Sequence, residues 1–126
     1  MRATDLARFY QALLHNPGGL WEPALLADVT GRVRNRLPDR VTTMPANRTL
    51  GLSQAGDDGW APFRGFGQST SPRAFGHNGA GGQVAFADPA TGLSFGYCTN
   101  GLDANVLRQW KRTYSIASRA AACAVA

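Results

Sequence analysis

The chain has 126 residues, 44% of them hydrophobic and 17% charged, which fits one folded domain better than an intrinsically disordered chain. The formal net charge is +5, but the densest basic group, Arg32 to Arg40, is interrupted by Asp39 and forms no continuous stripe. A basic nucleic-acid-binding module is therefore only a minor alternative. Cys98 and Cys123 lack metal-ligand and C-x-x-C spacing, so no metal or other cofactor is expected.

The N-terminal segment is predicted to be a helix and not a signal peptide. Arg2, Asp5 and Arg8 interrupt any apolar leader core, and no stretch reaches the length of a membrane span. A cytoplasmic location is the default expectation. The pattern predicts a helix from about Asp5 to His15 with Thr4 as its N-cap. One face of this helix is apolar: Leu6, Phe9, Tyr10, Leu13 and Leu14.

The middle of the chain gives weaker signals. A short helix is predicted from Pro23 to about Val29, because proline suits a first helical turn. Residues 31–45 are basic and polar and receive no assignment. A strand is predicted over residues 48–53, followed by a turn at 56–59. Residues 60–82 contain too much glycine for a helix, but their aromatic side chains require burial.

The clearest prediction is a β-hairpin near the C-terminal end. Residues 83–87 and 93–99 are predicted to be strands. The loop between them, Asp-Pro-Ala-Thr-Gly, contains residues that are typical of turns. A helix follows from about Asp103, with an apolar stripe of Val106, Trp110, Tyr114, Ala117 and Ala121. The order helix, helix, strand, hairpin, helix predicts an α+β fold with helices packed on an antiparallel sheet.

The run from Phe75 to Tyr97, FGHNGAGGQVAFADPATGLSFGY, resembles the end of the β-lactamase-like serine hydrolases. This family includes class C β-lactamases, D-alanyl-D-alanine carboxypeptidases and related esterases. Its third motif is K-T-G, or H-x-G where histidine replaces lysine. Here His77-Asn78-Gly79 stands immediately before the predicted hairpin, and the opening TDLARF helix also resembles one in these enzymes. The resemblance implies that residues 1–126 are a single, incomplete C-terminal segment of the β-lactamase/transpeptidase-like fold.

The resemblance also implies the site residues. Attack on a carbonyl carbon builds negative charge on its oxygen, which preorganised donors must meet. The Ala80 N–H would supply one such donor, and His77 would lie beside the nucleophile. Asn78 would offer a hydrogen bond to the substrate carbonyl or carboxylate, and Gly79 would leave room for the substrate.

The family's nucleophile motif, S-x-x-K, is absent from this chain. Lys111 is the only lysine, and Arg108 stands three residues before it. The sequence therefore predicts a C-terminal fragment of a serine hydrolase that acts by acyl transfer and is inactive alone. Its partners would be the missing N-terminal part and a small ester, amide or lactam substrate. An esterase, a β-lactamase and a D-Ala peptidase remain open, with histidine in the motif favouring esterase or peptidase activity. A non-catalytic remnant that binds a ligand or partner is the alternative.

Overall fold

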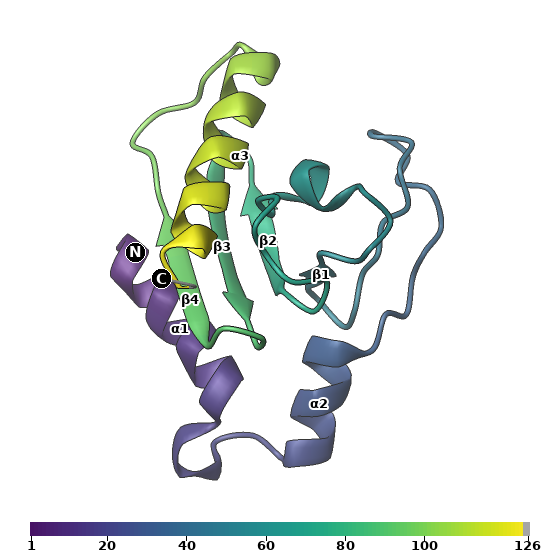
Figure 1. Ribbon diagram of the computed structural model, residues 1–126, viewed down its shortest axis with the longest axis vertical. Coiled ribbons are helices and arrows are strands. Elements are labelled where there is room, and N and C mark those ends of the chain that lie inside the picture. The colour runs from purple at the N-terminus through teal and green to yellow at the C-terminus, as the bar shows by residue number, and fades with distance from the viewer. Residues whose placement is uncertain (125–126) are drawn as a thin grey trace.

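The computed structural model describes residues 1–124 and shows helices on both faces of a four-stranded antiparallel sheet (Figure 1). This arrangement confirms the α+β prediction. The elements in chain order are α1 (Ala3–His15), η1 (Pro17–Gly19), α2 (Pro23–Gly31), β1 (Ser53–Gln54), η2 (Ala61–Arg64), β2 (Phe75–Gly79), β3 (Gln83–Asp88), β4 (Leu93–Tyr97) and α3 (Val106–Ala122). Within the described part of the chain, no helix is long and apolar enough to cross a membrane.

The sheet has the order β1-β2-β3-β4, so each strand pairs with its neighbour in sequence. The predicted hairpin is confirmed as β3 and β4. The sequence did not predict β2, because its glycines have low strand propensity. A β-carbon at Gly76 would lie 2.6 Å from the Cα atom of Phe86, so glycine is what lets β2 approach β3 this closely.

The strand predicted over residues 48–53 is wrong as a continuous strand. The backbone turns back on itself here: Arg48 and Ser53 form an antiparallel bridge, and the Thr49 N–H donates to the Leu52 carbonyl at 2.9 Å. Gly51 has a φ of +92°, which allows this tight reversal. Only Ser53 and Gln54 remain as β1.

Two predicted helix starts also differ from the structure. The helix α1 begins at Ala3, and the carboxylate of Asp5 accepts a hydrogen bond from the Arg2 backbone N–H at 2.8 Å, so Thr4 is not the N-cap. The helix α3 begins at Val106, after Asn105 accepts a hydrogen bond from the N–H of Arg108 at 3.0 Å.

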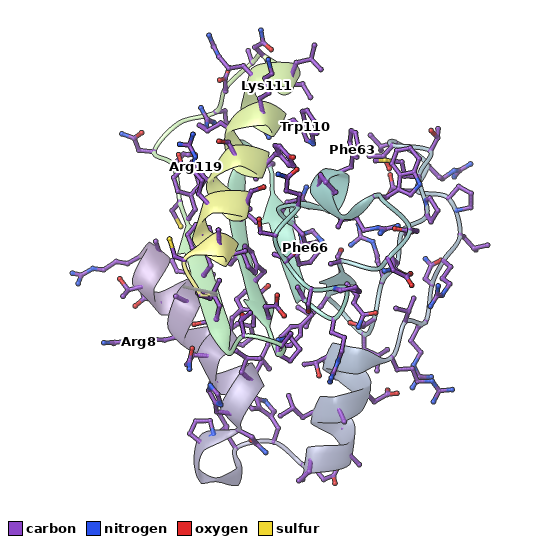
Figure 2. The ribbon with its side chains drawn as sticks, in the orientation of Figure 1. Arg8, Phe63, Phe66, Trp110, Lys111 and Arg119 are labelled. Carbon is purple, nitrogen blue, oxygen red and sulfur yellow. The ribbon has the colours of Figure 1, made fainter. Side chains whose placement is uncertain are left out.

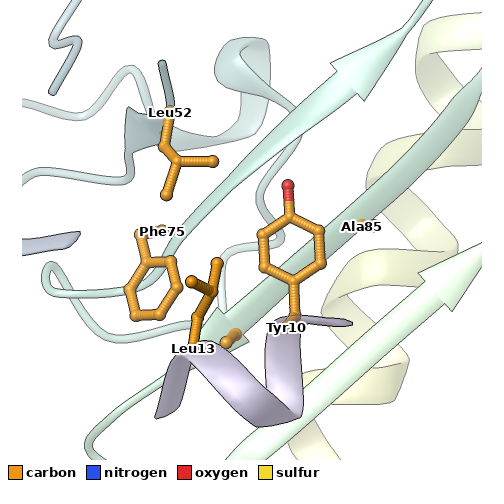
Figure 3. Packing of buried hydrophobic residues seen from close by; sticks show 6 residues of the cluster. Tyr10, Leu13, Leu52, Phe75 and Ala85 are labelled. Carbon is orange, nitrogen blue, oxygen red and sulfur yellow. The ribbon is translucent and has the colours of Figure 1, made fainter. Parts of the chain in front are cut away.

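One hydrophobic core lies between α1 and the sheet (Figure 3). Tyr10 and Leu13 pack against Phe75 and Ala85 on this face, and Leu52 closes one side. The contact with β4 is close because Gly96 has no side chain: a β-carbon there would lie 2.5 Å from the Ala3 carbonyl oxygen.

A second core lies between the opposite face and α3. Phe66 and Phe86 are fully buried there, together with Ala117. Val106 was predicted on the apolar stripe of this helix, but it is 71% exposed. The reason is that the first turn of α3 projects beyond the ends of the strands (Figure 1).

Candidate active site

The predicted motif lies on an open edge of the sheet. The strand β1 pairs only with Phe75 and Gly76 of β2. Beyond Gly76, no strand of the described chain lies on the outer side of β2. His77, Asn78 and Gly79 occupy this free edge, Ala80 follows in the turn to β3, and all four are exposed. An open strand edge can present its backbone groups to an extended ligand.

His77 lies on the α1 side of the sheet, because it pairs with Ala85, which belongs to the core on that side. Both ring nitrogens have partners. The Nε2 atom is 2.9 Å from Nη1 of Arg48, and the Nδ1 atom is 2.5 Å from the carbonyl oxygen of Asn78. The imidazole is therefore held in one orientation although it is exposed.

Asn78 is on the opposite side and packs against the end of η2. A β-carbon at Gly65 would lie 2.7 Å from the β-carbon of Asn78, so only glycine fits at that position. Gly65 also has a φ of +93°, which glycine adopts without strain. The 3-10 helix η2 is thus fixed against the motif strand.

Ala80 begins a turn that glycine makes possible. Gly81 and Gly82 have φ values of +87° and +90°, and the Gly82 N–H donates to the Gly79 carbonyl at 3.4 Å. Thr113 of α3 donates to the carbonyl of Gly82 at 3.3 Å and anchors the turn. Within residues 1–124, no acceptor is hydrogen-bonded to the Ala80 N–H. This donor is therefore free to meet a ligand oxygen.

A cavity of about 80 Å³ lies beside the motif strand. Its walls come from the 39–48 segment, β1, η2 and β2, and include Asp39, Arg48, Ser53, Phe63, Arg64 and Asn78. The Asp39 carboxylate is 4.0 Å from Nη2 of Arg48. Hydrogen bonds from the backbone N–H groups of Thr42 and Val41 hold the pKa of Asp39 below its usual range, with a smaller contribution from Arg48.

Arg64 holds the walls of this cavity together from inside. Its side chain is 5% exposed and donates to the carbonyl oxygens of Pro45 and Ala55 and to both carboxylate oxygens of Asp58. The hydrogen bonds from Arg64 lower the pKa of Asp58. A buried guanidinium needs such partners, because an unpaired charge in the interior is costly.

An aromatic row extends from the cavity towards α3. Phe63 stacks on Trp110 with ring centroids 4.9 Å apart (Figure 2). Trp60 lies next to Phe63 at one end of the row, and Tyr114 stacks on Trp110 at the other. Trp60 and Phe63 are 39% and 42% exposed. The aromatic side chains of residues 60–82 were predicted to require burial, and of these Phe66 belongs to the core.

Sequence reasoning missed Arg48 and Arg64. Arg48 is 29 positions from His77, and Arg64 is 19 positions from Pro45, so no local pattern indicates either contact. A search for basic residues near aromatic and glycine-rich segments could have singled out Arg64, but nothing in the sequence distinguishes Arg48 from other exposed arginines.

A larger hollow, about 650 Å³, lies elsewhere, between the end of β4 and the start of α3. Its lining includes Tyr97, Asp103 and Arg112 and none of the four motif residues. Across residues 1–124, no three His, Cys, Asp or Glu side chains gather as they would around a metal ion. The open edge of β2 is therefore the candidate site, because it carries the Ala80 donor and the oriented His77, and its Asn78 lines the cavity beside it.

Comparisons with known proteins address the fold of the chain and its family. A family model described as Beta-lactamase matches residues 1–118. A crystal structure of a β-lactamase from Mycobacterium bovis is similar to the chain, with a TM-score of 0.75 and 24% sequence identity. The similarity covers 96% of this chain and 43% of that one, and at this identity it shows the fold. No curated protein matches the chain.

Proposed function

Because this chain belongs to the β-lactamase family, we propose that it supplies the H-x-G edge of a serine hydrolase that works by acyl transfer. The observation that carries the proposal is the Ala80 N–H, which no acceptor in residues 1–124 engages, at the end of an open strand edge. A donor held in place before the reaction is what a developing oxyanion requires. His77 and Asn78 lie on the same edge and would orient the substrate.

The proposed reaction takes its nucleophile from outside this chain. A serine oxygen would attack the carbonyl carbon, the bond to the alcohol or amine would break, and that group would leave with a proton. Water would then hydrolyse the acyl-enzyme ester. The six serines of this chain are not followed three residues later by lysine, so we expect no turnover from the chain alone.

The surface near α1 fits a missing part of the same domain. An apolar groove of about 250 Å³ runs between α1, α2 and the 50–52 segment. Phe9, Leu25 and Leu50 line it and are each about half exposed. Contiguous apolar surface of this kind marks a contact with another segment or chain. We propose that residues 1–126 form one incomplete β-lactamase-like segment and that the N-terminal part of the fold covers this groove.

The site favours a substrate with an apolar group beside the reacting carbonyl. Phe63 lines the cavity next to Asn78, and Trp60 extends the same exposed aromatic surface. Histidine in place of lysine favours an ester or a peptide over a β-lactam.

A non-catalytic remnant that binds a ligand or partner is the second candidate, and the absence of S-x-x-K from the chain favours it. The coding sequence upstream of Met1 distinguishes the two. An S-x-x-K in frame supports the hydrolase, whereas a chain that never carries this motif supports the binding remnant. Nucleic-acid binding, by contrast, would weaken steeply with added salt.

The test compares the 126-residue chain with a version extended upstream to include an S-x-x-K, using a chromogenic short-chain ester and a chromogenic cephalosporin. We expect no turnover from the short chain and turnover from the long one. In the long chain, Ala80→Pro removes the N–H and should lower kcat by about 10² to 10³, as the loss of one oxyanion donor does. Ala80→Gly keeps the N–H and is the matched control. Sustained turnover by the short chain, or equal rates for the two Ala80 variants, would contradict the proposal.

A further inference from the structure

The hydrogen bonds of His77 define which of its ring nitrogens carries the proton. Arginine has N–H donors and no acceptor, so the 2.9 Å contact requires Nε2 of His77 to accept from Nη1 of Arg48. The other nitrogen, Nδ1, is 2.5 Å from the carbonyl oxygen of Asn78, which can only accept. From these partners we assign a neutral imidazole with its proton on Nδ1.

Arg48 is placed by the backbone around it and not by His77 alone. Its N–H donates to the Asn35 carbonyl at 2.9 Å, its own carbonyl accepts from the Asn35 N–H at 3.0 Å, and it forms a bridge with Ser53. The charged groups near the guanidinium are Asp39, at 4.0 Å, and Arg64 in the same cavity. Arg64 is paired with Asp58 at 2.6 Å, whereas Asp39 lies at the longer distance of 4.0 Å from Nη2 of Arg48 and leaves Nη1 to donate to His77. Arg48 is therefore the guanidinium that reaches the motif.

We infer that Arg48 is a positioning residue of the H-x-G site. It fixes His77 as the neutral Nδ1–H tautomer and brings to the motif the permanent positive charge that lysine carries in K-T-G. The role of the site in this inference rests on the proposed function. The contact between Arg48 and His77 does not, because both residues belong to this chain and the contact is present without a substrate or a nucleophile.

The chemistry follows from the difference between the two side chains. A histidine is only partly charged near neutral pH, whereas the guanidinium of arginine is always charged. With its Nε2 lone pair directed at Arg48, His77 has no free ring nitrogen to accept a proton from a nucleophile. The pair therefore acts through charge and orientation, which stabilise a developing oxyanion, and not as a general base.

The experiment measures the tautomer in the 126-residue chain itself. Nitrogen-15 NMR correlates the ring hydrogens of histidine with its two ring nitrogens and distinguishes the protonated from the unprotonated one. The spectrum is recorded at a pH where free histidine is neutral. Four proteins are compared: the natural chain, Arg48→Met, Arg48→Lys and Arg32→Met. The His77→Gln variant assigns the signals, and His15 is an internal reference.

We expect the natural chain to show His77 protonated on Nδ1. Arg48→Met keeps an unbranched apolar stem but has no donor, so Nε2 loses its partner. The Asn78 carbonyl still favours Nδ1–H, and we therefore expect a mixture in which the share of the Nε2–H tautomer, which free histidine prefers, rises measurably. Arg48→Lys should restore the Nδ1–H form, because lysine can donate and carries a charge. Arg32→Met removes an exposed arginine that pairs with Asp28 and makes no contact with His77, so it should change nothing.

An Nε2–H tautomer in the natural chain, or an unchanged tautomer in Arg48→Met, would overturn the inference. The backbone amide spectrum of each variant shows whether it is folded. If Arg48→Met does not fold, the tautomer of the natural chain and its persistence in Arg48→Lys still decide the question. Because no turnover is measured, this inference and the proposed acyl transfer can fail independently.

Discussion

Replacing Arg64 by methionine would remove five hydrogen bonds from the interior beside the site. The guanidinium donates twice to the Pro45 carbonyl, at 2.8 and 3.1 Å, once to the Ala55 carbonyl at 2.7 Å, and to the two oxygens of Asp58 at 2.7 and 2.6 Å. Asp58 is 37% exposed and can rehydrate, but the two carbonyls lose these donors. A buried acceptor left unpaired costs about 1 to 3 kcal/mol. We therefore expect Arg64→Met to lower the free energy of unfolding by about 3 kcal/mol.

Urea denaturation followed by tryptophan fluorescence measures this loss. With an m-value of about 1 to 3 kcal/mol per M, a loss of about 3 kcal/mol lowers the urea midpoint by about 1 to 3 M. Arg73→Met is the matched control, because Arg73 is exposed and its side chain makes no hydrogen bond within residues 1–124. Equal midpoints for the two variants would refute the reasoning that Arg64 holds the cavity walls together.

Two further predictions concern the packing of the helices on the sheet. A β-carbon at Gly67 would overlap the backbone of Ser118 in α3, so Gly67→Ala should lower the free energy of unfolding by about 3 kcal/mol in a urea titration. Gly101→Ala is the control and should change it little, because a β-carbon there meets open space. Similar urea midpoints for the two variants would contradict this. Burial raises the pKa of Tyr10 to about 12. Its contribution to stability is complete below about pH 10 and declines by about 2 to 3 kcal/mol as the pH rises to about 12, because the unfolded chain ionises first. Tyr10→Phe should lack this part of the decline, and parallel pH profiles of the two proteins would argue against it.

The sequence was most informative where structure depends on neighbouring residues. The helix α1 and the β3–β4 hairpin follow from apolar periodicity and turn chemistry, and both are present close to the predicted positions. The motif run also identified the family before any contact was known. The predicted starts of α1 and α3 differ from the observed ones by two or three residues. The reason is that neighbouring residues, such as Asn105, compete to cap the helix.

The sequence could not reveal β2 as a strand. Three of its five residues would be read as strand-breaking or neutral, namely Gly76, Asn78 and Gly79. They form a strand because β3 offers a full ladder of partners and because Gly76 fits closely against Phe86. Pairing across the sheet outweighs the weak preference of the segment itself.

By itself, the sequence determined the helices, the hairpin, the family resemblance and the residue types of the motif, because each of these depends on residues that are close together in the sequence. Only the tertiary structure decided that the motif lies on an open edge, that Arg48 meets His77 and that Arg64 ties three segments together. These contacts join residues that are far apart in the sequence. Their energy depends on burial and geometry that exist only after the helices and the sheet have packed.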